Sequence, residues 1–341
     1  MTQAAESQPA QFKIPGPVLS GETADIYFAR AIEILEKEGR DPVVTMEVFS
    51  GCQGVLCGVK EALELLRDVL DQEAEVWALP EGEQFSPKEP VLRIAGRYRS
   101  FGLYETAILG ILAHSSGWAT ASRECVEASR GIPVVSFGAR HVHPKVSDIM
   151  DYAAIVGGCI TGSTPAGAQL AGMPAAGTMP HALILVFGDT VDAALAFDRH
   201  MPPGVPRIVL VDTYKDEVEE SLRVAVAMNE RLQGVRLDTP SERGRVTPDL
   251  VKEVRAHLDM AGYRHVTITV SGGLDPDRIR LFSEKGAPVD AFGVGSYISG
   301  ARPIDFTGDL KEVEGKSVAK RGRIPGITPS TRLVKVDLKN L

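Results

Sequence analysis

The sequence predicts an α/β protein in which an N-terminal α+β domain is followed by a seven-stranded α/β barrel or near-barrel. Three observations indicate this fold. Helices and strands are mixed in the first third of the chain, short apolar segments alternate with helical ones from about residue 130, and polar residues follow the apolar segments. Apolar strands that alternate with helices are typical of a parallel sheet covered on both faces. A doubly wound open sheet is the alternative to the barrel.

The first part of the chain predicts a separate domain over residues 21–115. Residues 1–20 contain polar residues, three prolines and one glycine, so we expect a mobile leader there. Apolar spacing predicts helices over 23–38, 59–70 and 102–114. The expected strands are 43–49, 75–79 and 91–98.

The regular pattern that follows predicts a barrel domain over residues 116–305. Its seven expected strands are 133–138, 154–162, 174–178, 207–214, 234–238, 265–273 and 290–295. Helical segments lie between most of them, over 146–154, 188–200, 216–232, 247–261 and 275–286. A basic C-terminal segment over 306–341 is expected to return toward the N-terminal domain.

Composition and charge argue against several classes of protein. The net charge of −8 argues against a general nucleic-acid surface. The four cysteines form no C-x-x-C pair, so a zinc knuckle is not expected. No apolar run is long enough to cross a membrane and residues 1–11 do not resemble a signal peptide. We therefore expect a cytoplasmic protein.

Charged side chains recur at the positions where the expected strands end. Arg140, His181, Asp212, Arg236 and Asp238 all occupy such positions. A barrel brings the carboxyl ends of its strands to one face, where barrel enzymes carry out chemistry. We therefore expect these five side chains to converge.

Two glycine-rich turns, SGGLD and FGVG, follow the last two expected strands. Backbone N–H groups in such turns can hold a phosphate, although the glycines could also serve only to make tight turns. Because the last two loops of barrels often bind phosphate, their adjacency favours the first interpretation. The residues expected to contact phosphate are Ser271, Gly272, Gly273, Gly293, Val294 and Gly295.

Arg236 and Asp238 lie on the same side of the strand that contains them, because side chains alternate along a strand. An inward-facing arginine needs an anionic partner. This partner could be Asp238, in a structural salt bridge, or the carboxylate of a ligand, which we prefer.

Asp212 and Asp238 could orient a sugar hydroxyl, hold Mg²⁺ through water or stabilise positive charge on a sugar carbon. Asp212 could instead cap the next helix.

The histidines near the expected strand ends do not indicate a particular chemistry by themselves. A lone histidine such as His181, in GTMPH ahead of an apolar helix, is usually structural. His141 and His143 lack an identifiable third ligand for a metal, so a polar loop is the preferred interpretation. Arg140, which ends FGAR, is a further candidate ligand for an anion.

Taken in order, these motifs resemble nicotinate phosphoribosyltransferases over roughly residues 20 to 325. The resemblance rests on TADIYFAR, YETAILGIL, FGAR, GST, GTMPH, DTY, VRLD, SGGLD, FGVG and KSVAKRGR. It implies an N-terminal α+β domain followed by an incomplete seven-stranded α/β barrel, in agreement with the strand count above. The same resemblance implies a dimer or larger homo-oligomer with active sites shared between subunits. It also implies that nicotinate and phosphoribosyl pyrophosphate are converted to nicotinate mononucleotide and pyrophosphate, with Mg²⁺ and coupled ATP hydrolysis. No nucleic acid or membrane partner is expected.

The resemblance also implies residue roles. The expected catalytic residues are Arg236, Asp238, Asp212 and His181, of which His181 matches the phosphorylated histidine of the family. The expected substrate-binding residues are Arg140, Phe137, Tyr27, Thr178, Ser163 and Thr164. Phe137 and Tyr27 would stack on the pyridine ring, with Tyr27 coming from the neighbouring subunit. Pyrophosphate would be held by Lys316, Lys320 and Arg321.

The sequence departs from the family pattern at two places. His141 stands where many members have arginine, and Thr239-Pro240-Ser241 stands where many have Ser-Gly-Asp. The chain is also shorter than many relatives. These departures affect the contacts expected with nicotinate and pyrophosphate.

Three alternatives remain. Quinolinate phosphoribosyltransferase would require additional cations for a second carboxylate and would give His181 no role. A barrel aldolase or glycosidase would require an essential lysine or paired carboxylates without phosphate loops. A non-catalytic ligand sensor on the same fold would bind substrate without turnover.

Overall fold

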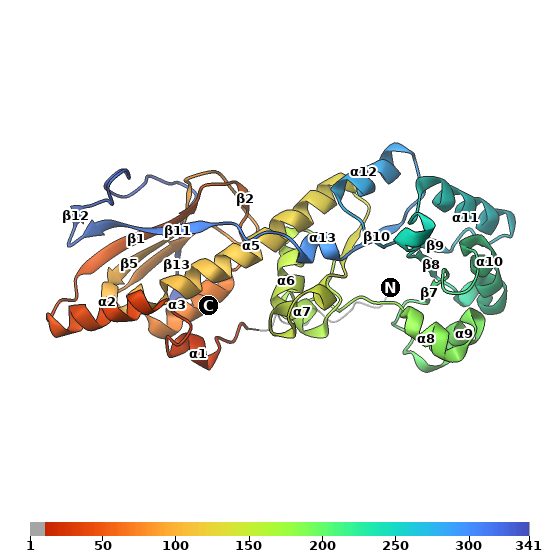
Figure 1. Cartoon of the computed structure of the whole chain (residues 1–341), viewed down its shortest axis with the longest axis horizontal. Coiled ribbons are helices and arrows are strands. Elements are labelled where there is room, and N and C mark those ends of the chain that lie inside the picture. Colours follow the sequence, from red (N-terminus) through yellow and green to blue (C-terminus); the bar gives the residue numbers. More distant parts are fainter. Residues whose placement is uncertain (1–10, 341) are drawn as a thin grey trace. The chain divides into compact units, whose positions relative to one another are not determined.

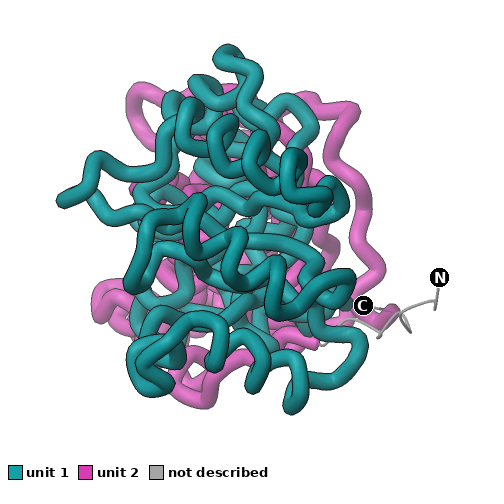
Figure 2. The backbone as a smooth tube through the Cα atoms, turned by 90° about the vertical axis from the view of Figure 1, so that its right-hand side faces the viewer, with its two compact units in different colours: residues 1–8, 121–300 teal, residues 9–120, 301–341 magenta. Residues whose placement is uncertain are grey.

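The computed structural model describes residues 11–340, which divide into two units. Figure 2 colours them separately: unit 1 holds residues 121–300, and unit 2 holds residues 11–120 and 301–340. The boundaries expected at 115/116 and 305/306 each lie five residues from these divisions. The helix expected over 102–114 is wrong in extent: α5 spans Glu105–Ala128, and its buried apolar positions continue as far as Ala128.

The expected leader is described only in part. Residues 1–10 lie outside the described residues. Beyond them, α1 Gly16–Leu19 forms a short helix, and Val18 and Leu19 pack against the core of unit 2. The hydroxyl of Tyr104 donates to the backbone oxygen of Leu19 at 2.9 Å, so the last residues of this segment are fixed to the unit.

Unit 2 is built on a six-stranded antiparallel sheet in the order β12-β11-β1-β5-β3-β13 (Figure 1). Its strands are β1 Val43–Ser50, β3 Glu75–Ala78, β5 Pro90–Arg97, β11 Phe306–Val313, β12 Lys316–Ser317 and β13 Val334–Val336. A second sheet pairs β2 Gly54–Val55 with β4 Gln84–Phe85. The helices are α1, α2 Ile26–Lys37, α3 Val59–Val69, α4 Tyr98–Phe101 and most of α5. The C-terminal segment thus contributes three strands to this unit.

A buried carboxylate ties the C-terminal segment to the main sheet of unit 2. Glu47, in the central strand β1, is 1% exposed. It accepts hydrogen bonds from Arg93 Nε at 2.9 Å and Nη2 at 2.7 Å, and from the backbone N–H of Thr328 at 3.1 Å. Arg93 also donates to the backbone oxygen of Thr328 at 2.6 Å. Because a buried charge is costly without partners, this network holds residues near 328 against the sheet.

Unit 1 contains a five-stranded parallel sheet in the order β6-β10-β9-β8-β7 (Figure 1). The strands are β6 Val134–Ser136, β7 Ile208–Leu210, β8 Gly234–Leu237, β9 Thr267–Val270 and β10 Ala291–Val294. The helices are α6 Ser147–Gly157, α7 Pro165–Leu170, α8 His181–Phe187, α9 Thr190–His200, α10 Glu217–Met228, α11 Pro248–Met260, α12 Pro276–Glu284 and α13 Ser296–Ser299. The apolar strand residues are almost entirely buried, as expected for a parallel sheet covered on both faces.

Two of the seven expected barrel strands are wrong. Within the expected strand 154–162, residues 154–157 are the last turn of α6. The backbone beyond this helix is irregular at the glycines. Thr161 pairs with Val135 of β6 in an isolated parallel bridge. Residues 174–178 form no strand, and Pro174 has no backbone N–H to donate to a neighbouring strand. One backbone hydrogen bond is present in this segment, from Ala176 N–H to the oxygen of Gly162 at 3.0 Å. These segments continue the β6 edge irregularly, so unit 1 is barrel-like with five regular strands.

The other sequence-predicted helices of unit 1 are confirmed, with ends shifted by a few residues. Asp189, Asp216, Thr247 and Asp275 each accept backbone N–H bonds at the start of a helix. In the chain described over 11–340, no helix combines the length and apolarity needed to span a membrane.

The Glu47 network predicts a large stability effect confined to unit 2. Glu47→Ala should lower the free energy of unfolding by about 3–5 kcal/mol, because Arg93 is left buried without its counter-charge. Both tryptophans, Trp77 and Trp118, belong to unit 2, so denaturant unfolding followed by tryptophan fluorescence measures it.

The matched control is Glu33→Ala, which removes the exposed ion pair with Lys37 and should cost less than about 1 kcal/mol. An equal effect of the two substitutions would contradict the role given to the buried pair.

Candidate active site

Polar side chains meet at the carboxyl ends of β7, β8 and β9. Asp212 and Asp238 follow β7 and β8, and Ser271 follows β9. The backbone N–H of Asp238 donates to Asp212 Oδ2 at 3.0 Å, and the Ser271 hydroxyl donates to Asp238 Oδ1 at 2.9 Å. Asp212 and Asp238 are therefore linked by a hydrogen bond from backbone to carboxylate. They lie at the carboxyl ends of neighbouring strands, as the barrel prediction required.

His181 joins this group from the first residue of α8. Its Nδ1 lies 3.0 Å from the hydroxyl of Thr213. Its Nε2 lies 3.5 Å from Asp238 Oδ2 and 4.0 Å from Asp212 Oδ1. The side chain is 38% exposed, so solvent and solutes can reach the ring. The structure thus brings His181 to the two carboxylates, although they are distant in sequence.

The two carboxylates have opposite pKa shifts. Burial raises the pKa of Asp212 to about 6, with Asp238 adding to the rise and His181 opposing it. The Asp212 side chain is 1% exposed, and its Oδ1 has no hydrogen-bond partner among residues 11–340. Burial also acts to raise the pKa of Asp238, but hydrogen bonds with His181 and Ser271 and the charge of Arg236 bring it below its ordinary value. Asp212 is therefore the carboxylate whose charge is least compensated.

Arg236 lies in β8, beside an aromatic ring. Its guanidinium carbon is 5.7 Å from the centre of the Phe137 ring. Its Nη2 is 3.5 Å from the backbone oxygen of Met179, and its buried Nε has no partner in the described chain. Burial lowers the pKa of Arg236, while Asp238 and Asp212 oppose the shift. Arg236 and Asp238 form no salt bridge in the part of the chain described, so the structural alternative left open by the sequence is not observed.

The FGVG turn fixes the ring of Phe137. An ideal Cβ on Gly293 would lie 2.3 Å from Phe137 Cε2, and one on Gly295 would lie 3.1 Å from the Phe137 backbone oxygen. The backbone N–H of Phe137 donates to the oxygen of Val294 at 2.8 Å. Glycine is thus needed here for close packing, whether or not the turn also holds phosphate.

Sequence reasoning missed Asp151, a fully buried carboxylate on α6. It accepts bonds from the hydroxyls of Ser136 at 2.7 Å, Ser163 at 3.3 Å and Thr164 at 2.8 Å, and from Thr164 N–H at 2.7 Å. Ser163 and Thr164, predicted to bind substrate, are therefore held by Asp151. The available signal was an acidic residue within an otherwise apolar segment of a predicted helix.

The remaining predicted residues lie in three places. Thr178 immediately precedes Met179, next to Arg236, and Arg140 is near enough for its charge to lower the pKa of Arg236. His141 Nδ1 lies 3.3 Å from the Ser299 hydroxyl. The predicted residues that belong to unit 2 are Tyr27, Lys316, Lys320 and Arg321.

The site offers few protein ligands for a metal. Among residues 11–340, no three His, Cys, Asp or Glu side chains are grouped to hold a metal ion. Asp212 and Asp238 offer carboxylate oxygens, including the unpartnered Oδ1 of Asp212. This donor set fits Mg²⁺ that receives its other oxygens from a phosphorylated substrate and water.

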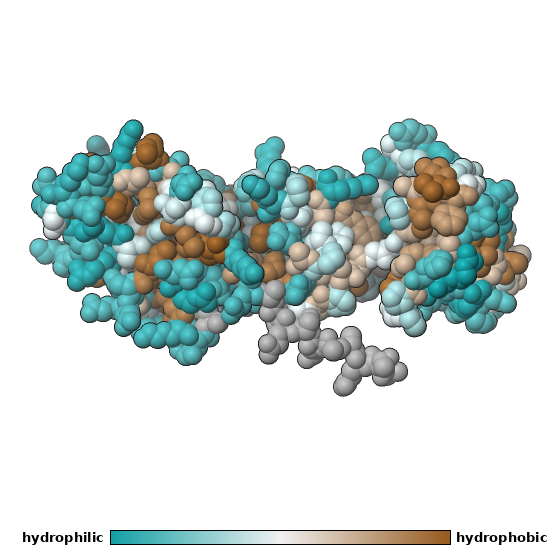
Figure 3. Space-filling view, turned by 90° about the horizontal axis from the view of Figure 1, so that it is seen from below, coloured by the Kyte–Doolittle hydropathy of each residue, from teal (hydrophilic) through white to brown (hydrophobic). Residues whose placement is uncertain are grey.

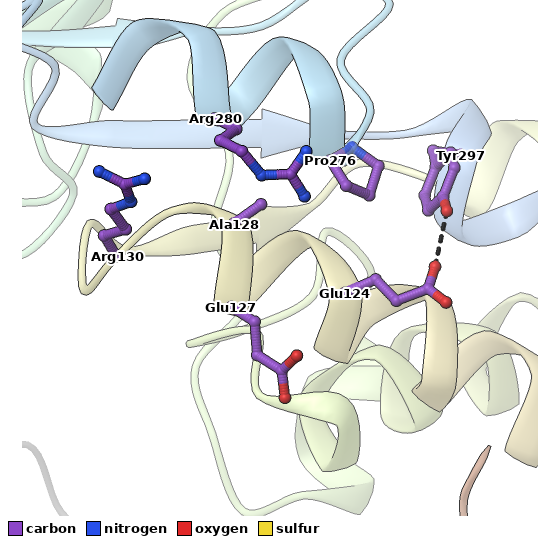
Figure 4. Close-up of a pocket in the computed structure, with 7 residues that line it drawn as sticks. All are labelled: Glu124, Glu127, Ala128, Arg130, Pro276, Arg280 and Tyr297. Carbon is purple, nitrogen blue, oxygen red and sulfur yellow. Dashed lines mark hydrogen bonds between the residues drawn. The ribbon is translucent and has the colours of Figure 1, made fainter. Parts of the chain in front are cut away.

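A separate surface pocket of about 360 Å³ lies in unit 1 between α5, α12 and α13 (Figure 4). Its lining includes Glu124, Arg280 and Tyr297, and the Tyr297 hydroxyl donates to Glu124 at 2.6 Å. None of the residues predicted to bind substrate lines this pocket. The pocket is therefore separate from the predicted site residues.

The chain is similar to known phosphoribosyltransferases over most of its length. The family models for quinolinate phosphoribosyl transferase match residues 25–116 with the N-terminal domain and residues 118–309 with the C-terminal domain. Nicotinate phosphoribosyltransferase pncB2 of Mycobacterium tuberculosis is 34% identical over 255 residues, which cover 72% of this chain and 53% of the relative. The chain thus spans about half the length of this relative.

Solved structures show the same fold. A nicotinate-nucleotide pyrophosphorylase from Pyrococcus furiosus is 44% identical, with a TM-score of 0.85 over 93% of this chain and 82% of that chain. Human nicotinic acid phosphoribosyltransferase is 19% identical, with a TM-score of 0.71 over 89% of this chain and 77% of that chain. This likeness supports the fold alone. From the two family-model matches, the chain belongs to the quinolinate phosphoribosyl transferase family.

Proposed function

We propose that the chain is a nicotinate phosphoribosyltransferase, which joins nicotinate to phosphoribosyl pyrophosphate in NAD biosynthesis or salvage. The observation that carries the proposal is the pairing of Arg236 with Phe137. An aromatic face beside a partly buried guanidinium, whose Nε has no hydrogen-bond partner in the described chain, suits a flat ring that carries a carboxylate. Relatives named nicotinate phosphoribosyltransferase support the same substrate.

The chemistry follows from charge. The pyridine nitrogen is already nucleophilic at neutral pH, so attack on the anomeric carbon needs no strong general base. As pyrophosphate departs, positive charge develops on the sugar, and the carboxylates of Asp212 and Asp238 would stabilise it. Asp212 and Asp238 would also hold Mg²⁺ directly or through water, and the ion would neutralise the leaving group.

Quinolinate phosphoribosyltransferase is the second candidate, because the matching family models have that name. Quinolinate has one more carboxylate than nicotinate and would need another cation close to Arg236. Arg140 already lies close enough to affect Arg236. Offering nicotinate, nicotinamide and quinolinate separately with phosphoribosyl pyrophosphate and Mg²⁺, and identifying the mononucleotide, decides between the candidates.

The proposal includes a homodimer or larger assembly with shared sites. Tyr27 is 59% exposed on α2, beside Ile26 at 62%. In unit 1, Leu185, Val186 and Phe187 of α8 are also exposed. Hydrophobic surface is visible on the face shown in Figure 3. Exposed apolar side chains of this kind are suited to contact with a second subunit, to which Tyr27 would contribute its ring.

ATP coupling through His181 is the remaining part of the proposal. The Thr213 contact orients the ring, and Asp238 lies near its other nitrogen. A ring nitrogen of His181 could accept the γ-phosphoryl group of ATP, with ADP as the leaving group. The added charge would then order the basic segment that contains Lys316, Lys320 and Arg321 over pyrophosphate.

The Arg236 assignment predicts selectivity for a carboxylate. Nicotinate should be turned over at least about tenfold more efficiently than nicotinamide, because the amide leaves the guanidinium unpaired. Arg236→Ala should lower kcat/KM for nicotinate at least about a hundredfold, and Arg236→Lys should restore it only in part. Steady-state assays on the full chain measure both effects.

The matched control is Arg231→Ala, which removes an arginine that is 57% exposed and paired with Asp198. Its kcat/KM should equal that of the parent. Full activity of Arg236→Ala, or equal use of the two bases, would contradict the assignment.

The pKa of Asp212 predicts a pH dependence. If ionised Asp212 stabilises the sugar cation, kcat/KM should fall as the pH drops below about 6, by up to about tenfold per pH unit. Asp212→Asn should have a lower rate and should lack this acidic limb. A pH–rate profile of each protein tests this.

A half-buried acid with a raised pKa, Glu105, provides the control. Burial and the charge of Asp309 raise the pKa of Glu105 to about 7. Glu105→Gln should keep the limb near pH 6. Retention of the limb in Asp212→Asn would show that another group titrates there.

The coupling proposal predicts that ATP lowers the apparent KM for nicotinate or phosphoribosyl pyrophosphate. His181→Ala should abolish this effect and retain measurable synthesis without ATP, because the pyridine attack itself needs no phosphorylated enzyme. Initial rates with and without ATP measure the effect. Equal stimulation of parent and variant by ATP would exclude His181 as the coupling residue.

A further inference from the structure

The guanidinium of Arg245 lies directly against the SGG turn. Arg245 belongs to the loop after β8, two residues beyond the short 3-10 helix Ser241–Arg243. An ideal Cβ on Gly273 would fall 1.3 Å from Arg245 Nη1 and 2.5 Å from its Cζ. The guanidinium therefore fills the space that any side chain at position 273 would need. Glycine at this position allows the cation to contact the backbone of the turn.

The backbone of Arg245 has an uncommon conformation. Its φ of 66° lies in the left-handed region, which residues other than glycine rarely adopt. The N–H of Arg245 donates to the oxygen of Pro240 at 3.1 Å, and that of Gly244 to Ser241 at 3.0 Å, which fixes the turn. Such a conformation costs on the order of 1 kcal/mol. The loop keeps it while placing the guanidinium at Gly273.

Three arginines lie around this loop, but they differ in their partners. Arg278 donates to a backbone oxygen at 3.0 Å, and Arg243 faces Glu217 at 3.9 Å. Within the described chain, the Arg245 side chain has neither an ion-pair nor a hydrogen-bond partner, although its charge is felt by the exposed Glu242. Arg245 is thus the cation whose donors are free at the turn.

The turn itself has free donors. Ser271 N–H donates to Leu237 at 2.9 Å, whereas the N–H groups of Gly272 and Gly273 have no partner among residues 11–340. Asp238 is close on the other side, because an ideal Cβ on Gly272 would be 2.9 Å from its Oδ1. An anion at this turn therefore needs a cation to offset the nearby carboxylate.

We propose that Arg245 binds the phosphate monoester of the substrate at the SGG turn, as a ligand beside the backbone N–H groups. This inference rests on the proposed function, in which that monoester is the 5′-phosphate of the phosphoribosyl group. A guanidinium presents paired donors to two phosphoryl oxygens, and its charge balances part of the dianion. The sequence did not indicate this role, because Arg245 lies outside the glycine motif.

Calorimetric titration of the full chain with ribose 5-phosphate, at fixed salt and pH 8, tests the proposal without requiring turnover. Arg245→Gln should raise the Kd at least about tenfold, as expected for lost hydrogen bonds to a charged group. Arg245→Lys keeps the charge without the paired donors and should raise the Kd by about threefold or more. The matched control is Arg243→Gln, which removes an arginine of the same loop that faces Glu217 and should change the Kd less than about twofold.

Thermal unfolding of each variant shows whether it is folded. Parent-like affinity in Arg245→Gln overturns the inference and leaves the proposed function standing. If Arg245→Gln does not fold, parent-like affinity in Arg245→Lys overturns it instead. A parent that binds neither ribose 5-phosphate nor phosphoribosyl pyrophosphate overturns both the inference and the proposed function.

Discussion

The incomplete pairing of buried charges at the carboxyl ends of β7 and β8 is the constraint on which the site depends. The side chain of Asp212 is buried and Arg236 is partly buried, and each has a buried polar atom without a hydrogen-bond partner in residues 11–340. A fold that served stability alone would pair or remove such groups. Their retention is explained if substrate and metal complete the pairing, so that the charges of the free protein are already in place for the reaction.

Much of the fold was predictable, because its elements have local signals. Five regular strands of unit 1 and the helices between them follow from apolar runs and from capping residues such as Asp189 and Asp275. The strands expected over 154–162 and 174–178 failed because an apolar segment does not reveal whether its backbone pairs. The expected strands include Gly157, Gly158 and Pro174, which disrupt regular pairing in these two segments.

The site was predictable where residues share a strand end, and less so where contacts are tertiary. Barrel topology alone placed Asp212, Asp238 and Arg236 together. It could not show that Asp151 holds Ser163 and Thr164, or that Arg245 lies on Gly273, because both contacts depend on the conformation of irregular loops rather than on which strand ends meet. Barrel topology also left the partner of Arg236 open. A side chain that points to the active face can either form a salt bridge within the protein or remain available to a ligand.

The stability of Asp212→Asn as a function of pH tests the central claim most directly. Burial raises the pKa of Asp212 to about 6, above the value near 4 of an unfolded chain, so ionisation costs folding free energy. The penalty is absent below about pH 4 and reaches about 3 kcal/mol above about pH 6. Asparagine can still accept the bond from Asp238 N–H. Denaturant unfolding followed by circular dichroism should therefore find the variant more stable than the parent at pH 8, with the difference vanishing near pH 4. A variant less stable than the parent at pH 8 would show that the protein already compensates this charge, and would contradict the account.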